Sequence, residues 1–176
     1  MTSYFIIPGH GDSGPRHWQT YFEQSGANFR RINQLEWESP DCHTWVQTIE
    51  QTVSMYDISE IVLVGHSLGC IAIAQWAHQF PRLIKGAFLV APADVEAPGF
   101  SLPVRNFGPI PLEKLPFKSI VVASSNDPWM SLERSEYLAG QWGSEFENLG
   151  EAGHINAASG HGNWDEGLKL LKEKLG

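Results

Sequence analysis

The sequence predicts an α/β fold in which a mostly parallel sheet carries helices on both faces. Short apolar runs alternate along the chain with longer segments of helical period, and two of the runs, Ile61–Val64 and Ile120–Ala123, are apolar throughout. A strand without a polar face is typical of a parallel sheet that is covered on both sides. Strands that alternate with helices in this way are joined by crossovers and therefore pair in parallel.

The individual elements follow from apolar periodicity and from the residues that begin or end helices. The six predicted strands are Tyr4–Ile7, Phe29–Ile32, Ile61–Val64, Ala87–Val90, Ile120–Ala123 and Phe146–Leu149. The predicted helices run from Pro15 to Gln24, from the Ser39-Pro40 pair to Tyr56, and over Leu68–Phe80, Ser131–Trp142 and Trp164–Leu175. Six prolines within residues 91–118 predict an irregular excursion there, too short for a helical lid or a second domain.

Length and composition indicate one globular domain that spans residues 1–176. Hydrophobic residues make up 42% of the chain and charged residues 18%, which is ordinary globular usage. The formal net charge of -8, without a basic run, makes nucleic acid and membrane surfaces poor partners. We further expect no signal peptide, no membrane span, no disulfide framework from the two cysteines, and a cytoplasmic monomer.

The segment Gly65-His66-Ser67-Leu68-Gly69 fits the G-x-S-x-G pattern of a nucleophile held on a sharp turn. It stands between a predicted strand and a predicted helix, which is the context that the pattern requires. Such a turn crowds its flanks, so glycine is needed two residues to either side, and the N-terminus of the following helix favours negative charge. Ser67 is the predicted nucleophile, and the alternative is a serine that only caps the helix.

A serine hydroxyl needs a base, and in folds with this turn the chain order is serine, acid, histidine. His154 directly follows the last predicted strand and is the predicted base, whereas His161 lies seven residues further on. Asp127 follows the strand that comes two after the nucleophile, and it is the predicted orienting acid. Asp94, which follows the intervening strand, is the alternative acid.

Two backbone N–H groups are expected to stabilise the oxyanion that acyl transfer forms. One belongs to Leu68, the residue after the nucleophile. The other is expected in the loop after the first strand, Pro8-Gly9-His10-Gly11, with His10 or Gly11 as the donor. Because backbone groups do this work, the side chains of the loop are only weakly constrained.

Four side chains in or near the loops at this end of the sheet are candidates for the substrate pocket: His66, Trp18, Phe107 and Trp129. The aromatic residues among them favour an apolar acyl pocket, although large aromatic side chains are more often part of a core. Without a helical lid, an open pocket would fit small esters, thioesters and peptide ends. The expected partner is such a small-molecule or peptide substrate, and no cofactor is needed.

The glycine-rich loop also supports a rival interpretation. The segment Gly9-His10-Gly11-Asp12-Ser13-Gly14 fits the G-x-G-x-x-G pattern of dinucleotide binding, and Glu36 lies near where a ribose-binding acid is expected. The second strand is weak, however, and this interpretation leaves all three catalytic candidates unexplained. A metal site made of His10, Asp12 and His17 is disfavoured because their spacing matches no tetrahedral pattern.

With these residues placed, the chain resembles the small serine hydrolases named after retinoblastoma-binding protein 9, the YdeN-like group. The segments that carry the resemblance are Pro8-Gly-His-Gly-Asp-Ser, His17-Trp18, Gly65-His-Ser-Leu-Gly, Phe107-Gly-Pro-Ile-Pro-Leu-Glu-Lys-Leu-Pro, Ser125-Asn-Asp-Pro and Gly153-His-Ile-Asn. The resemblance implies a compact α/β-hydrolase without a cap domain, and a catalytic triad of Ser67, Asp127 and His154. The namesake of the group binds a pocket protein through an L-x-C-x-E motif, and neither cysteine here lies in such a motif, so that partner is not expected.

The predicted function is acyl transfer to water by a serine hydrolase of carboxylesterase or peptidase type. The substrate would be a small ester, a thioester, or a peptide or aminoacyl amide, and the acyl-enzyme would form on Ser67. The alternative from another class is a non-enzymatic module that keeps the fold and binds a protein partner through its loops. The complete set of three candidate residues argues against that alternative, because a pure binder would not need them.

Overall fold

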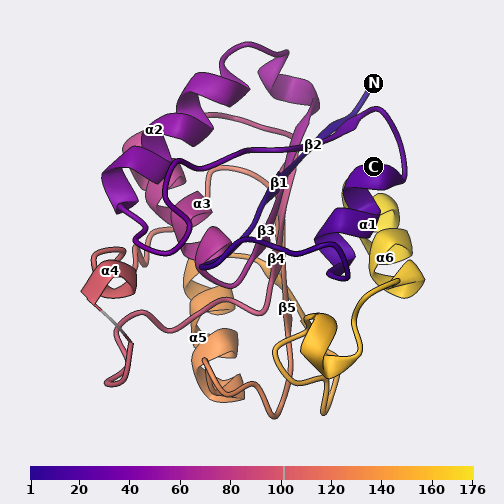
Figure 1. The fold of residues 1–176 in the computed structure, drawn as a ribbon. Helices are drawn as coiled ribbons and strands as arrows, with labels where there is room; N and C mark the ends of the chain where they lie inside the picture. The colour runs from indigo at the N-terminus through magenta and orange to yellow at the C-terminus, as the bar shows by residue number, and fades with distance from the viewer. Residues whose placement is uncertain (101) are drawn as a thin grey trace.

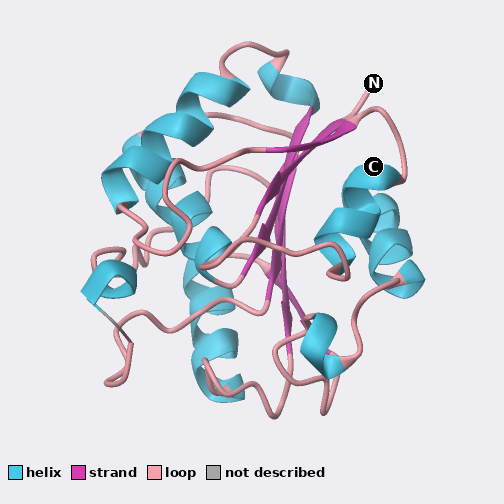
Figure 2. Cartoon of the chain, in the orientation of Figure 1, coloured by secondary structure: helices cyan, strands magenta, loops and turns pink. Residues whose placement is uncertain are grey.

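The computed structural model describes residues 1–100 and 102–176, and its centre is a six-stranded sheet (Figure 1, Figure 2). The strands are β1 (Ser3–Ile7), β2 (Phe29–Arg31), β3 (Ile61–His66), β4 (Gly86–Val90), β5 (Ser119–Ala123) and β6 (Glu145–Asn148). Their order across the sheet is β2-β1-β3-β4-β5-β6, and all five pairings are parallel. The predicted α/β class with a parallel sheet is confirmed.

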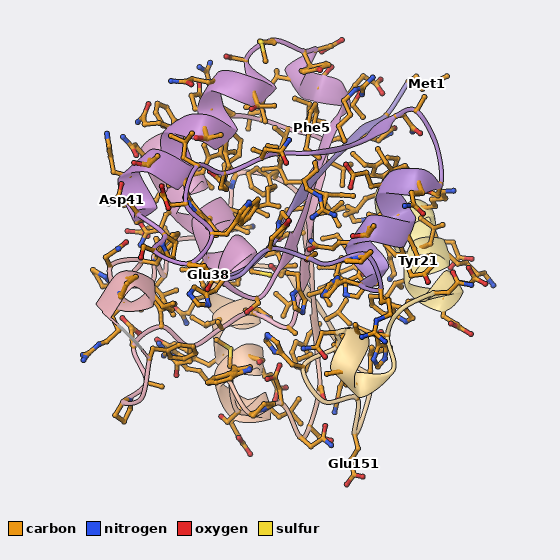
Figure 3. The ribbon with its side chains drawn as sticks, viewed as in Figure 1. Met1, Phe5, Tyr21, Glu38, Asp41 and Glu151 are labelled. Carbon is orange, nitrogen blue, oxygen red and sulfur yellow. The ribbon has the colours of Figure 1, made fainter. Side chains whose placement is uncertain are left out.

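Helices cover both faces of the sheet because successive strand residues point to opposite sides. The helices on one face are α2 (Cys42–Val53), α3 (Leu68–Gln79) and α5 (Leu132–Trp142), and those on the other are α1 (Trp18–Gln24) and α6 (Asp165–Leu175) (Figure 1). In β1, Phe5 packs in the hydrophobic core between the sheet and α2, α3 and α5, whereas Ile6 packs in the core between the sheet and α1 and α6. Figure 3 shows Phe5 inside the molecule, whereas Tyr21 and Glu151 lie on its surface. In the described ranges no helix is long and apolar enough to cross a bilayer.

The helix α1 begins later than the sequence predicts. Its predicted start is Pro15, but the first helical residue is Trp18. His17 provides the cap, because its Nδ1 accepts a hydrogen bond from the backbone N–H of Gln19 at 3.2 Å. A histidine is an uncommon cap, so this start is not visible in the usual pattern of serine, threonine, aspartate or asparagine.

The helix α2 also begins later than predicted, at Cys42 instead of directly after the Ser39-Pro40 pair. The cap is Asp41, whose carboxylate accepts a hydrogen bond from the backbone N–H of Thr44 at 2.8 Å. A carboxylate is a stronger acceptor than a serine hydroxyl and also complements the positive end of the helix dipole. The preceding proline therefore lies before the helix.

The segment between β4 and β5 forms no additional layer in its described part. Its one helix there is α4 (Leu102–Arg105), which has four residues. Val95, Val104 and Phe107 anchor the segment because they pack into the core under α2 and α3. Residue 101, which belongs to the predicted irregular excursion, lies outside the described residues. The described part of this segment thus adds no cap above the sheet, in agreement with the predicted fold class.

The chain reverses its direction of travel across the sheet between β1 and β3. From β1 it steps outward to β2, and then it returns past β1 to β3 and continues to β6. At such a switch point the loops from two neighbouring strands diverge to opposite faces, and a crevice for ligands opens between them. Here the loop after β1 leads to α1 on one face, and Ser67 leads from β3 to α3 on the other. The topology therefore places Ser67 at this crevice.

Candidate active site

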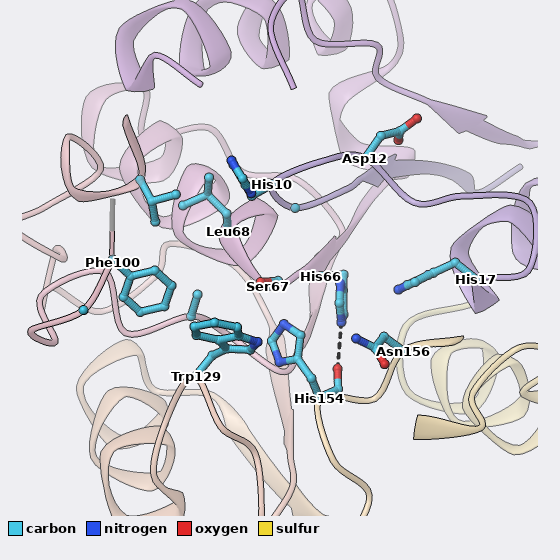
Figure 4. Close-up of a pocket in the computed structure, with 14 residues that line it drawn as sticks. His10, Asp12, His17, His66, Ser67, Leu68, Phe100, Trp129, His154 and Asn156 are labelled. Atoms are coloured by element: carbon cyan, nitrogen blue, oxygen red, sulfur yellow. Dashed lines mark hydrogen bonds between the residues drawn. The ribbon is translucent and has the colours of Figure 1, made fainter. Parts of the chain in front are cut away.

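Ser67 occupies the sharp turn between β3, which ends at His66, and α3, which begins at Leu68. Its backbone dihedral angles are φ 54° and ψ -122°, a combination that a residue with a side chain rarely adopts. Although Ser67 stands at the N-cap position, its side chain makes no capping hydrogen bond. The hydroxyl is thus not used to hold the helix, and Ser67 lines the pocket shown in Figure 4.

The first turn of α3 packs against the end of β1 more closely than a side chain would permit. A Cβ atom on Gly69 would lie 2.1 Å from the carbonyl oxygen of Ile7 and 2.7 Å from that of Pro8. The glycine that the motif places two residues after Ser67 is therefore required by contact with neighbouring backbone. This contact also brings the N-terminus of α3, where negative charge is favoured, beside the loop after β1.

Asp127 and His154 form a hydrogen-bonded pair that comes from the loops after β5 and β6. The Nδ1 atom of His154 lies 2.9 Å from each carboxylate oxygen of Asp127, and the two side chains are 9% and 3% exposed. A carboxylate only accepts hydrogen bonds, so Nδ1 carries the proton and Nε2 is left as an acceptor. Figure 4 shows the imidazole of His154 beside Ser67 in the pocket.

The loop that carries His154 is held by side chains from the loop after β5. Ser124 Oγ accepts a hydrogen bond from the N–H of Ala152 at 3.0 Å, and Asn126 Oδ1 accepts one from the N–H of Gly153 at 2.7 Å. These bonds join the loop of the histidine to the loop of its carboxylate partner. The pair is therefore preorganised by the protein itself and does not depend on a substrate for its geometry.

His66 holds the backbone of His154. Its Nε2 lies 2.9 Å from the carbonyl oxygen of His154 and therefore donates its proton there (Figure 4). Burial lowers the pKa of His66 well below its usual range, so the ring stays neutral. The next residue, Ile155, has a positive φ of 44°, and its carbonyl accepts a hydrogen bond from the indole N–H of Trp18 at 2.8 Å. Both sides of the histidine backbone are thus fixed.

The loop after β1 runs directly over the serine turn. A Cβ atom on Gly9 would lie 2.8 Å from the Cβ of the serine and 3.2 Å from the backbone nitrogen of Leu68. The N–H of Gly11 donates to the carbonyl of Trp37 at 3.0 Å and is therefore engaged. Among the described residues, no hydrogen-bond acceptor meets the N–H of His10 or that of Leu68. Of the two donors predicted in this loop, only His10 keeps an unused N–H group.

Gln19 is a site residue that the sequence analysis missed. It is fully buried, and its Nε2 donates to the carbonyls of Ile7 at 3.3 Å and Val64 at 3.1 Å, while its Oε1 accepts from Ser13 Oγ at 2.6 Å. These bonds join the ends of β1 and β3 to the loop that covers the serine turn. No local pattern marks this role, since a glutamine near the start of a helix is usually a surface residue.

The pocket has a volume of about 390 Å³ and two chemically different ends. The apolar end is lined by Ala93, Phe100, Val104 and Trp129, and the ring centroids of the two aromatic residues lie 5.3 Å apart. The polar end is lined by Asp12, His17, His66 and Asn156. Figure 4 shows Ser67 and His154 between these two ends. A molecule bound across the pocket would therefore have different surroundings on the two sides of the serine.

Two of the four predicted pocket residues line the pocket, and two do not. His66 and the half-exposed Trp129 face the cavity. Trp18 and Phe107 are fully buried in the two hydrophobic cores, so their predicted pocket role is wrong. Their rings pack against other aromatic side chains on opposite sides of the sheet, where burial of such large apolar surfaces stabilises the fold most.

The alternative acid and the alternative base lie elsewhere. The carboxylate of Asp94 lies 3.7 Å from Nε of Arg134, and the ring of His161 packs on Trp164 with a centroid distance of 5.7 Å. Neither residue lines the pocket of Ser67. The structure thus brings together the acid and the histidine that the strand order favours.

The arrangement of the glycine-rich loop does not suit a dinucleotide. In that fold the helix begins at the glycines and presents free N–H groups to the pyrophosphate. Here α1 begins at Trp18, four residues after Gly14, and Gly9 packs on the serine turn. Within residues 1–100 and 102–176, no three His, Cys, Asp or Glu side chains gather closely enough to hold a metal ion.

The parallel sheet, the strained serine turn and the acid–histidine pair together define an α/β-hydrolase. The chain belongs to the serine hydrolase family, whose model matches residues 4–173. Membership of this family makes the protein a hydrolase. The comparison with curated protein sequences finds no match.

Solved structures agree with this assignment. A protein described as a YdeN-like hydrolase from Pectobacterium atrosepticum is 36% identical, with a TM-score of 0.86 over 99% of this chain and 90% of that one. The ydeN gene product from B. subtilis is 21% identical, with a TM-score of 0.80 over 99% and 98% of the two chains. Est1E from Butyrivibrio proteoclasticus, solved with ferulic acid bound, shares the fold at 14% identity, with a TM-score of 0.74 over 99% and 89%. The resemblance to the YdeN-like group is confirmed.

Proposed function

We propose that the protein hydrolyses a small ester, a thioester, or a peptide or aminoacyl amide, through an acyl-enzyme on Ser67. The observation that carries this proposal is the Asp127–His154 pair, with 2.9 Å from Nδ1 to each carboxylate oxygen. His154 lines the same pocket as Ser67, whose hydroxyl is free of any capping role. Because Asp127 holds the proton on Nδ1, the free Nε2 of His154 is the group that takes the serine proton.

In the acylation step the Ser67 oxygen forms a bond to the substrate carbonyl carbon while His154 Nε2 takes the hydroxyl proton. The carbonyl oxygen becomes an oxyanion, which the N–H groups of Leu68 and His10 stabilise. When the tetrahedral intermediate collapses, the bond to the leaving group breaks, and the leaving group receives the proton from Nε2. Asp127 stabilises the imidazolium that exists between these two proton transfers.

In the deacylation step His154 Nε2 takes a proton from a water molecule, whose oxygen forms a bond to the acyl carbon. The second oxyanion uses the same two N–H donors. Its collapse breaks the bond to Ser67, and the serine oxygen regains the proton from Nε2. The acid product leaves, and the enzyme returns to its starting state without a cofactor.

The test is labelling with a fluorophosphonate, read by intact mass and peptide mapping, together with hydrolysis of p-nitrophenyl acetate. We expect one phosphonate on Ser67, loss of label and turnover in Ser67→Ala, and loss of at least about a thousandfold in turnover in His154→Asn. His161→Asn is the matched control and should retain both labelling and turnover, because the ring of His161 packs on Trp164 outside the pocket. Undiminished hydrolysis by Ser67→Ala would refute the proposal, and a folded protein that neither labels nor hydrolyses would indicate a binding module.

A further inference from the structure

His17 presents a hydrogen-bond donor without a partner at the polar end of the pocket. Its side chain is 93% buried, since only 7% is exposed, and Figure 4 shows the ring pointing into the pocket. Its Nδ1 accepts the N–H of Gln19 at 3.2 Å, so the proton of the neutral ring sits on Nε2. In the part of the chain that the structure describes, Nε2 meets no acceptor. A buried donor without a partner costs free energy, and the ring that carries this one lines the cavity.

The ring of His17 is neutral, so only one of its two nitrogens carries a proton. Burial, and next the positive charge of Arg31, lower its pKa to about 3, so the ring is neutral at physiological pH. The ring therefore offers one N–H group to the pocket and no positive charge. The carboxylate of Asp12, which also lines this end, forms an ion pair with Arg31 at 2.5 Å.

Asn156 supplies a second donor at the same end. Its Oδ1 accepts the backbone N–H of Ser159 at 3.0 Å, which determines the orientation of the amide group. Its Nδ2 is therefore the atom left for the pocket, and no hydrogen bond from it is made within the described residues. Figure 4 shows this amide between His17 and His154. The polar end thus combines two uncharged donors with no positive charge to attract an anion.

We propose that His17 Nε2–H and Asn156 Nδ2–H bind a neutral acceptor oxygen of the substrate, such as an ether, carbonyl or hydroxyl oxygen. The preferred substrate is then an ester or amide with an apolar group on one side of the scissile carbonyl, against Trp129 and Phe100, and an acceptor oxygen on the other. This inference rests on the proposed hydrolysis at Ser67. An anionic group is disfavoured there, because both donors are uncharged and the carboxylate of Asp12 lies at the same end.

Substrates that differ only at the acceptor test this specificity. A substrate with hydrocarbon in that place leaves both buried donors unpaired, whereas an ether oxygen satisfies them. Two matched pairs replace one methylene by an ether oxygen. The first pair differs in the acyl part and consists of p-nitrophenyl pentanoate and p-nitrophenyl 3-methoxypropanoate. The second pair differs in the alcohol part and consists of butyl acetate and 2-methoxyethyl acetate. The measured quantity is the ratio of kcat/KM for the ether over kcat/KM for the hydrocarbon.

For the wild-type protein we expect this ratio to exceed one in at least one of the two pairs. In that pair the ratio should be about tenfold lower for His17→Asn, because about tenfold corresponds to one hydrogen bond to a buried donor. Asparagine is a good cap, so this variant keeps the start of α1, and its shorter side chain no longer places an N–H group at the position of the imidazole Nε2. Asn156→Asp keeps the acceptor for Ser159 but replaces the donor by a carboxylate, and it lowers the same ratio. His161→Asn is the matched control and leaves the ratio unchanged.

The specificity proposal and the proposed function fail in different ways. If wild type prefers the hydrocarbon in both pairs, or if both site variants keep the wild-type ratio, the acceptor site is refuted while hydrolysis at Ser67 stands. A change in His161→Asn equal to that in His17→Asn would also refute it, because a general effect of the loops would then explain the change. Hydrolysis that survives Ser67→Ala refutes the proposed function itself, whatever the ratios are. Because the wild-type comparison needs no variant, the test holds even if a variant does not fold.

Discussion

Replacement of Asp127 by asparagine perturbs the acid–histidine pair at one atom while it keeps the shape of the side chain. Oδ1 of the aspartate accepts the backbone N–H of Trp129 at 2.9 Å, so the asparagine oxygen keeps that position. The amide nitrogen then takes the place of Oδ2, 2.9 Å from Nδ1 of His154. An amide N–H donates toward Nδ1, and the oxygen that remains 2.9 Å from Nδ1 is neutral and already accepts from Trp129, so the pair favours the tautomer with the imidazole proton on Nε2. In that tautomer the histidine has no acceptor for the serine proton.

The size of the effect follows from the burial of the pair. The carboxylate of Asp127 is 3% exposed, so water does not replace the lost charge. A charge-assisted hydrogen bond contributes about 1.5–3 kcal/mol, and the unfavourable tautomer adds a cost of similar size. The sum, about 3–6 kcal/mol, corresponds to a decrease in kcat of about 10²–10⁴-fold. The fold should be unaffected, because the shape of the side chain and the bond to Trp129 are kept.

The assay is steady-state hydrolysis of p-nitrophenyl acetate, together with the rate of fluorophosphonate labelling. Asp94→Asn is the matched control, since it makes the same chemical change in the loop after β4, beside Arg134, at a residue that does not line the pocket. We expect this control to keep kcat within about twofold of wild type. A decrease in kcat of less than tenfold in Asp127→Asn, or an equal loss in Asp94→Asn, would refute the assigned role of Asp127.

Two further predictions concern stability. Gly69→Ala should lower the free energy of unfolding by more than about 3 kcal/mol in urea titrations, because the added Cβ would meet the rigid carbonyl of Ile7 at 2.1 Å. The control is Gly140→Ala, where the added Cβ meets nothing within 4 Å, and this change should raise the free energy of unfolding by up to about 1 kcal/mol. Equal effects of the two substitutions would contradict this reasoning. The folded-state pKa of His17 is about 3, below its ordinary value of 6.5, so between these two values the unfolded chain binds one more proton than the folded chain. The free energy of unfolding therefore has its full value above pH 6.5 and falls as the pH is lowered toward 3, by up to about 1.4 kcal/mol per pH unit. Urea unfolding at several pH values should show a shallower decrease in His17→Asn, and an unchanged slope would count against a neutral buried ring.

Much of the fold and of the candidate site could be predicted because the relevant patterns are local. Apolar runs such as Ile61–Val64 predict buried strands, and the positions of Ser67 and Gly69 follow from the backbone of one tight turn. In a parallel sheet the order of strands along the chain then limits which loops can reach the serine. The prediction of Asp127 and His154 rests on that order, and the structure pairs the two residues.

Other features of the site depend on contacts between distant segments. Gly11 fits the oxyanion pattern as well as His10 does, and only the bond to Trp37 shows that its N–H is engaged. Trp18 and Phe107 could be identified as aromatic residues near the site, but their burial depends on neighbours from other helices. The start of α1 was missed for a local reason, because its cap is a histidine and not one of the usual capping residues.

The sequence by itself determined the α/β class, the nucleophile turn and the chain order of the catalytic candidates, because each depends on periodicity or on backbone geometry within a few residues. Only the tertiary structure decided which acid meets the histidine across 27 residues of chain, which N–H group of the first loop is unused, and which ring nitrogen of His17 carries its proton. Those decisions depend on the distance and direction between groups that the folded sheet brings together. A linear pattern of residues does not contain these distances.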